Sequence, residues 1–199
     1  MKVDLHVHAM ERSYCAVSGE EEMIQAAISR GLDGLAFTDH HRLVPPQRIT
    51  ELCQKYAPFR VFSGIEINVS GEDILVLGLD DPALDTRSWA YPTLHRFVRQ
   101  RGGFMILAHP FRFHNFINVD IETYRPDGIE VRSMNIRTQN VARIRALAEQ
   151  LDLMLVCNSD AHQARDVGAY YNILSRTPRD DSDLVSILMD GDYGCSEEI

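Results

Sequence analysis

The chain has 199 residues, 45% of them hydrophobic, which is enough for one core, so we expect a single domain over residues 1–199 with an acidic tail at roughly 191–199. Its formal net charge of −9 opposes binding to nucleic acid, because that binding relies on neutralising phosphates with Lys and Arg. The sequence shows neither an apolar run of membrane-spanning length nor a signal-peptide pattern, so we expect a cytoplasmic protein without membrane contact, while the oligomeric state stays open.

Apolar, β-rich runs alternate with segments of helical periodicity along the whole chain. Strands are expected at residues 3–7, 34–38, 60–65, 74–79, 104–108, 128–131 and 153–158. Helices are expected at residues 18–29, 46–56, 91–100, 138–150 and 181–189. Most of the strand segments are nearly continuous apolar runs, which is typical of strands buried on both faces. This order predicts an α/β fold with a mostly parallel sheet, either open or closed into a barrel.

The first expected strand carries three polar residues, Asp4, His6 and His8, that alternate with apolar ones. Successive side chains of a strand point to opposite faces, so the three polar side chains are expected on one face and the apolar ones on the other. Two imidazoles spaced in this way can bind the same transition-metal ion. For this segment alone, a pair of hydrogen-bonded histidines at a strand end is the alternative.

Further histidines and acids follow the carboxyl ends of the later expected strands. They are His40, Glu66, His109, Asp160 and His162. In parallel α/β folds these ends form the functional face, so the residues should join His6 and His8 in one cluster of imidazoles and carboxylates. Seven such groups are too many for one ion. They fit a site of two or three ions with a bridging carboxylate, which suits in-line displacement at phosphorus.

The order of these residues resembles the polymerase and histidinol phosphatase (PHP) superfamily. The matching motifs are Asp4-x-His6-x-His8, Thr38-Asp39-His40, Ala108-His109-Pro110 and Ser159-Asp160-Ala161-His162, with Glu66 after the third strand, and they span residues 3–168. The resemblance implies a distorted, TIM-like (β/α)7 barrel with the metal centre at the carboxyl ends of its strands. It also implies two or three divalent ions of manganese, iron or zinc, and mostly phosphoester hydrolysis.

The resemblance also implies a set of ligands. His6, His8, Glu66 and Asp160 would surround a first ion; Glu66 would bridge to a second ion held by His109; and His40 and His162 would hold a third. The chain departs from the family pattern at two positions. The family often has an aspartate where this chain has Ser13, which leaves Glu11 as the nearest carboxylate.

The second departure is Asp73, which stands where the family often has a histidine before the strand that follows the bridging glutamate. A carboxylate in place of an imidazole favours harder ions such as manganese. For both Glu11 and Asp73 the alternative is a solvated loop carboxylate with no ligand role.

Basic residues close to these motifs are candidates for contact with a substrate. Arg112 can bind a phosphate through forked, charge-assisted hydrogen bonds, and His41 or His114 can protonate a leaving alkoxide. Ordinary solvated loop residues are the alternative for all three.

The preferred hypothesis is a metal-dependent phosphoesterase that acts on small phosphate mono- or diesters through a metal-bound hydroxide, with Asp160 indispensable for activity. One alternative is a hydrolase of amides or lactones, because related barrels with a His-x-His opening perform that reaction. Another is a non-catalytic metal-binding PHP module, because some PHP domains attached to polymerases have lost their ligands.

Overall fold

The computed structural model describes residues 1–86 and 88–196 as a mixed α/β structure around one sheet. The strands are β1 (Lys2–Val7), β2 (Gly34–Phe37), β3 (Arg60–Val69), β4 (Glu72–Leu77), β5 (Phe104–Leu107), β6 (Gly128–Arg132), β7 (Met154–Cys157), β8 (Asn172–Leu174) and β9 (Tyr193–Cys195). The helices are α1 (Glu20–Ser29), α2 (Pro46–Lys55), α3 (Tyr91–Arg101), α4 (Val141–Leu151) and α5 (Asp181–Met189), with short 3₁₀ turns η1 (Pro82–Asp85) and η2 (Thr138–Asn140). Within this part of the chain, no helix is both long and apolar enough to cross a membrane.

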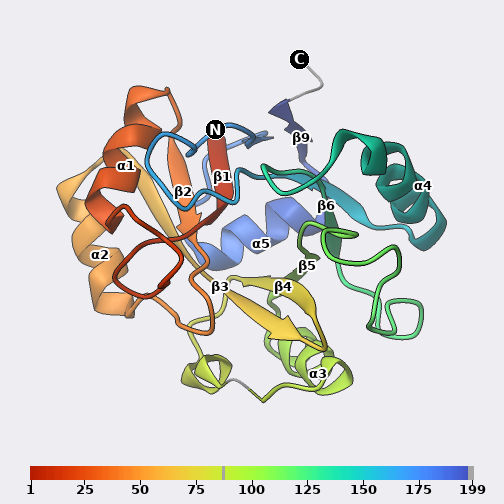
Figure 1. The fold of residues 1–199 in the computed structure, drawn as a ribbon. Coiled ribbons are helices and arrows are strands. Elements are labelled where there is room, and N and C mark those ends of the chain that lie inside the picture. The colour runs from red at the N-terminus through yellow and green to blue at the C-terminus, as the bar shows by residue number, and fades with distance from the viewer. Residues whose placement is uncertain (87, 197–199) are drawn as a thin grey trace.

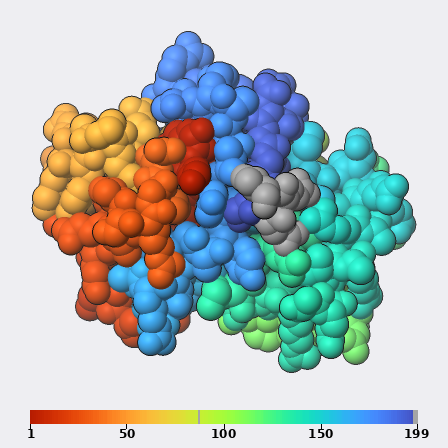
Figure 2. All heavy atoms as spheres, turned by 90° about the horizontal axis from the view of Figure 1, so that it is seen from above, coloured from red at the N-terminus to blue at the C-terminus, as the bar shows by residue number. Residues whose placement is uncertain are grey.

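The sheet runs in the order β7-β6-β5-β4-β3-β2-β1-β8-β9 and nearly closes into a barrel. Strands β1 to β3 are parallel to one another, and so are β5 to β7. The segment after β7 returns to β1, where Val7 and Ala161 form a parallel bridge. Figure 2 shows this contact between the two ends of the chain from above, with the first residues in dark red beside blue segments from near the end of the chain. The carboxyl ends of β1, β2 and β7 therefore meet at one rim.

A distorted (β/α)7 barrel with a mostly parallel sheet was expected, whereas the described residues form nine strands and four of their eight pairings are antiparallel. Strand β4 follows β3 through the two-residue turn Ser70–Gly71, where both φ angles are positive, at 55° and 86°. This conformation suits a tight hairpin, so β4 pairs antiparallel with β3 and then with β5, and no helix separates β3 from β4. The pairings of β8 with β1 and β9 are antiparallel as well.

Hydrophobic side chains from the strands fill the barrel, and α5 packs across it. The interior cluster contains Val3, Leu5, Phe62, Leu75, Phe104, Ile106, Val156, Leu184 and Leu188, among others. In Figure 1, α5 crosses the middle of the ring of strands, with α1 and α2 on one flank and α4 on the other. The outer helices bury two further clusters against the barrel, one under α1 and α2 and one under α3 and α4. A cluster of histidines and acids lies at the ends of the strands, outside this apolar interior, so the interior contains no unpaired charge from it.

Part of the segment expected to be a loose acidic tail forms a strand. Tyr193–Cys195 forms β9, which pairs with β8, and the side chain of Cys195 is buried. Residues 197–199, the last part of that expected tail, lie outside the described residues.

Candidate metal centre

The first strand contains an irregularity that separates the polar residues of its motif. Its pairing with β2 steps from Asp4 opposite Leu35 to Val7 opposite Phe37, so β1 has one residue more than β2 over this stretch. Leu5 consequently packs inside the barrel, whereas Val7 packs in the outer cluster under α1 and α2. The expectation that the apolar residues share one face is therefore wrong, because an extra residue in a strand reverses the alternation beyond it.

The same irregularity sets Asp4 apart from the two histidines. Its Oδ1 accepts hydrogen bonds from the backbone N–H groups of His6 at 3.3 Å and Ser159 at 3.0 Å, and its Oδ2 accepts one from Gly168 at 2.9 Å. Burial raises the pKa of this carboxyl to about 6, although these hydrogen bonds oppose the shift. Asp4 thus ties β1 to the loops after β7, and it leaves the histidines to form the site.

The centre of the cluster is made by His6 of β1, His8 directly after it, Glu66 of β3 and Asp160 in the loop after β7. His6 Nε2 lies 3.3 Å from Asp160 Oδ1 and 3.4 Å from Glu66 Oε1. His8 Nε2 lies 3.2 Å from Asp160 Oδ1 and 3.3 Å from Glu66 Oε2. The two Nε2 atoms are 3.0 Å apart, and all four side chains are buried. Four side chains whose nitrogen and oxygen atoms bind metals therefore converge on one small volume.

Further candidate ligands lie on two sides of this centre, and Glu66 contacts a histidine on each side. On one side His109 Nε2 lies 3.2 Å from Glu66 Oε1 and 3.8 Å from Asp73 Oδ2. On the other side His40 Nδ1 lies 2.9 Å from Glu66 Oε2. The ring of His162 stacks on that of His8, with 4.3 Å between their centroids.

Within the described residues, four trios of donor atoms lie close enough together to hold an ion. They are His6, His8 and Glu66; His6, His109 and Asp160; Glu66, Asp73 and His109; and His8, His40 and His162. The structure thus brings together all of the predicted ligands except Glu11.

Glu11 lies elsewhere because its carboxylate is already engaged. It accepts hydrogen bonds from the backbone N–H of Glu20, at 3.1 and 3.2 Å, at the first residue of α1. A carboxylate is stabilised there by the positive end of the helix dipole. The expectation that Glu11 replaces the missing family aspartate is therefore not supported.

Ser13, which occupies that family position, supports the cluster through its hydroxyl. Its Oγ donates to Asp39 Oδ1 at 2.7 Å and accepts from the backbone N–H of His40 at 3.1 Å. It also lies 3.4 Å from Nδ1 of His8. Asp39 in turn accepts a hydrogen bond from Nε of Arg12 at 2.7 Å. Ser13 thus connects two candidate ligands to a buried ion pair.

Glu130 was not among the site residues predicted from the sequence, although its carboxylate supports two of the predicted ligands. It is fully buried in β6, and its Oε1 lies 2.8 Å from Nδ1 of His6 and accepts a hydrogen bond from Nδ2 of Asn158 at 2.8 Å. Its Oε2 accepts the backbone N–H of His109, also at 2.8 Å. An ionised carboxylate only accepts, so Nδ1 of His6 donates to Glu130, and Nε2 is the nitrogen that faces the cluster and can bind an ion once it loses its proton. The sequence does contain a hint of this role, because Glu130 is a charged residue within the otherwise apolar run 128–131.

Three residues at or beside the cluster hold their backbone in the left-handed region, which non-glycine residues seldom adopt. His41, His109 and Asp160 have φ angles of 54°, 24° and 56°. Such conformations cost of order 1–3 kcal/mol each and persist where surrounding contacts impose them, typically at functional sites. Hydrogen bonds impose two of them here: the backbone N–H of His41 donates to the carbonyl of Glu66, and that of His109 donates to Glu130.

The cluster attracts positive charge. Burial alone lowers the pKa of His6, but the surrounding carboxylates, Asp160 foremost, raise it well above its usual value. The pKa values of His40 and His109 are also raised, because contact with Glu66 outweighs the effect of burial. Burial alone would raise the pKa of Glu66, yet the neighbouring imidazoles hold it well below its usual range. The same arrangement of charge stabilises a divalent cation.

The predicted substrate-contacting residues lie around the cluster. Arg112 approaches it, with Nη1 3.8 Å from Asp160 Oδ2 and about a third of the side chain exposed. His114 is exposed, stacks on Phe116 and lines a narrow recess beside Asp73. His41 lines a different cavity, beside His40.

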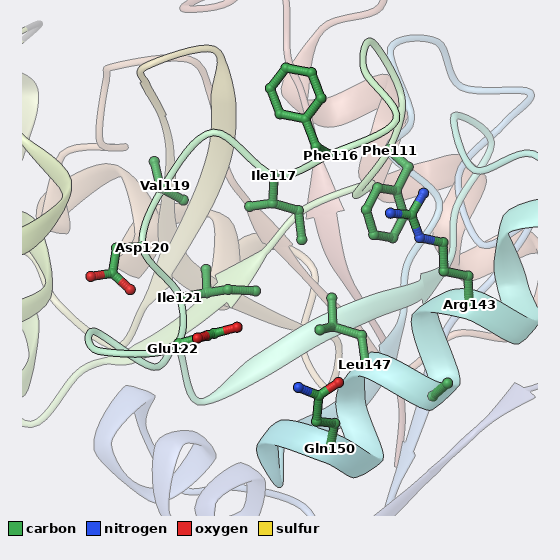
Figure 3. Close-up of a pocket in the computed structure, with 11 residues that line it drawn as sticks. Phe111, Phe116, Ile117, Val119, Asp120, Ile121, Glu122, Arg143, Leu147 and Gln150 are labelled. Atoms are coloured by element: carbon green, nitrogen blue, oxygen red, sulfur yellow. The ribbon is translucent and has the colours of Figure 1, made fainter.

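A groove of about 490 Å³ lies next to the recess, between residues 111–122 and α4 (Figure 3). Phe111 and Phe116 line both the groove and the recess. Phe111 is buried, with the guanidinium carbon of Arg143 3.9 Å from its ring centroid, whereas Phe116 is mostly exposed. The segment after β5 therefore separates the candidate metal centre from this apolar groove.

The sequence profile of the PHP domain matches residues 4–176. The chain belongs to the PHP domain family. The matched residues include the whole cluster, from His6 to His162. No curated protein matches the chain.

Several solved structures share this PHP fold. PsfC from Pseudomonas syringae PB-5123 is 24% identical with a TM-score of 0.70, over 94% of this chain and 87% of that one. A two-domain protein from Bacteroides vulgatus ATCC 8482, which contains a predicted PHP-like metal-dependent phosphoesterase, is 16% identical with a TM-score of 0.73, over 98% of this chain and 64% of that one. An amidohydrolase from Chromobacterium violaceum, with bound sulfate and no metal, is 16% identical with a TM-score of 0.62, over 84% and 90%. At 24% identity or less, each of these similarities shows a shared fold.

Proposed function

We propose that the protein is a phosphoesterase that hydrolyses small phosphate mono- or diesters at a centre of two or three divalent ions of manganese, iron or zinc. The observation that carries the proposal is the position of Glu66. Its Oε1 faces His6 and His109, while its Oε2 faces His8 and His40. A carboxylate whose two oxygens face separate sets of imidazoles is suited to bridging neighbouring ions, as in centres that carry out displacement at phosphorus.

The residues present fit such ions. His6 Nε2 and His8 Nε2 lie 3.0 Å apart, and Glu130 fixes the proton of His6 on its other nitrogen. The first ion would be held by His6, His8, Glu66 and Asp160; the second by Glu66, Asp73 and His109; and the third by His40 and His162. Mixed imidazole and carboxylate donors suit manganese, iron and zinc. Asp73 in the second set favours the harder manganese.

The ions, when bound, supply positive charge at the phosphoryl group and lower the pKa of the attacking water. The protein's own contribution is positioning. Arg112, at the edge of the cluster, can donate two parallel hydrogen bonds to phosphoryl oxygens. His41 and His114 lie on different sides of the cluster, so the side on which the organic group leaves determines which of them can protonate its oxygen.

The proposal is tested by loading the purified protein with manganese, iron or zinc and measuring hydrolysis of phosphomonoesters, phosphodiesters, amides and lactones. Asp160→Asn and His8→Ala should each lower kcat/KM for phosphoesters by roughly 100-fold or more, since even residues that only support ligands typically contribute 10–100-fold. His95→Ala is the matched control, because this histidine of α3 bonds the carbonyl of Arg125 outside the cluster.

Full activity in both cluster variants would refute the assignment of the ligands. Turnover of amides or lactones but not of phosphoesters would replace the proposal with an amidohydrolase. Bound metal without turnover of any substrate in the panel would favour a non-catalytic module.

A further inference from the structure

A cavity of about 310 Å³ opens from the cluster on the side of His40. Its lining comes from two loops, residues 10–15 after β1 and residues 40–42 after β2. His40 belongs to both the cavity and the cluster, because its Nδ1 lies 2.9 Å from Glu66 Oε2. A substrate whose phosphoryl group lies at the cluster can therefore extend its organic group into this cavity.

Two large hydrophobic side chains in the lining face solvent. The side chain of Tyr14 is 99% exposed and that of Met10 is 59% exposed. An aromatic ring and a thioether both make favourable contacts with the face or edge of another ring. Their exposure beside a reactive centre fits a ligand that covers them.

The cavity also carries positive charge that the protein does not neutralise. Across residues 1–86 and 88–196, the side chain of Arg42 makes no hydrogen bond or ion pair. The guanidinium of Arg12 already pairs with Asp39 and Glu20, and Glu11 is engaged at the start of α1. Arg42 is thus left to attract an anionic ester toward the cluster, and it can also lie over an aromatic ring.

We propose that this cavity is the subsite for the organic group of the substrate and that the group is a small aromatic one, which makes the preferred substrates aryl or heteroaryl phosphoesters. The inference rests on the proposed function. The volume lies at the lower end of the range for ligand pockets, which suits a small ring system and not a polymer. The leaving oxygen would then lie on the side of the cavity that His41 lines.

The test compares 1-naphthyl phosphate with glycerol phosphate as substrates of the manganese-loaded protein. Tyr14→Ala should lower kcat/KM for the naphthyl ester about tenfold, mainly through KM, because an aromatic pair contributes about 0.5–1.5 kcal/mol beyond the area it buries. The same variant should change kcat/KM for glycerol phosphate less than about twofold, and Tyr14→Phe should keep the preference for the naphthyl ester. Phe116→Ala is the matched control, because this ring is also exposed on a loop beside the site but does not line the cavity.

An equal loss of kcat/KM for both esters, or no loss for either, would overturn the subsite. If no phosphoester is hydrolysed, binding of 1-naphthylphosphonate to the same metal-loaded protein provides a separate measurement. Tyr14-dependent binding there would support the subsite although the proposed function had failed, whereas binding that is absent or indifferent to Tyr14→Ala would refute it.

Discussion

Replacing Glu130 with Gln should weaken metal binding although Glu130 is not itself a predicted ligand. The carboxylate receives three hydrogen bonds of 2.8 Å, from His6 Nδ1, Asn158 Nδ2 and the backbone N–H of His109. Glutamine keeps the shape but turns one oxygen into an NH₂ group, so at least one of these donors meets another donor. If that donor is His6 Nδ1, the ring moves its proton to Nε2 and loses the lone pair that faces the cluster.

The magnitude follows from the contacts. A hydrogen bond to a charged group contributes about 1.5–3 kcal/mol, so the metal-free protein should lose roughly that much free energy of unfolding. Residues that orient metal ligands typically change affinity 10–100-fold, and we expect the dissociation constant for manganese or zinc to rise by that factor.

The affinity is measured by competition with a chromophoric chelator, and the ring nitrogen of His6 that keeps its proton is read from ¹⁵N NMR of the zinc-loaded protein. Asp127→Asn is the matched control, because this buried carboxylate also accepts a backbone N–H, from Met105 at 2.9 Å, but belongs to none of the candidate metal trios. Wild-type affinity together with an unchanged His6 tautomer in Glu130→Gln would refute the reasoning.

Further predictions concern stability. Leu184→Ala should lower the free energy of unfolding by about 2–5 kcal/mol in urea titrations, since Leu184 is fully buried within the barrel; a loss below about 1 kcal/mol would contradict the packing of α5. Gly78→Ala should cost about 1–3 kcal/mol, because its φ of 80° is strained for alanine and the new Cβ would clash with Val185; equal thermal midpoints would contradict this. Hydrogen bonds from Arg176 and then Arg179 lower the pKa of Asp183 below its unfolded value, so its stabilisation is full at neutral pH, begins to fall as pH drops below the unfolded pKa of about 3.9, and is lost as pH falls through the lower folded pKa. Asp183→Asn should therefore destabilise the protein more at pH 7 than at pH 3, and an equal loss in urea titrations at both would contradict the ion pairing.

The order of residues along the chain was enough to predict the alternating strands and helices and the rim on which the reactive groups lie. The apolar runs determine which segments can be buried, and the histidines and acids that follow them are carried to the carboxyl ends of the strands. His6, His40, His109 and His162 come together for that reason, because parallel neighbours end on the same side.

Only the tertiary structure decided which carboxylates join them. Glu11 and Asp73 looked equivalent in the sequence. In the structure, Glu11 accepts the backbone N–H at the start of α1, whereas the β3–β4 hairpin places Asp73 beside His109. The extra residue in β1 and the support from Glu130 likewise depend on partners that lie far along the chain, such as Ser159 for Asp4 and His109 for Glu130. Local patterns show what each residue can do, whereas pairing between distant strands determines which residues meet and which donor atoms stay available for an ion.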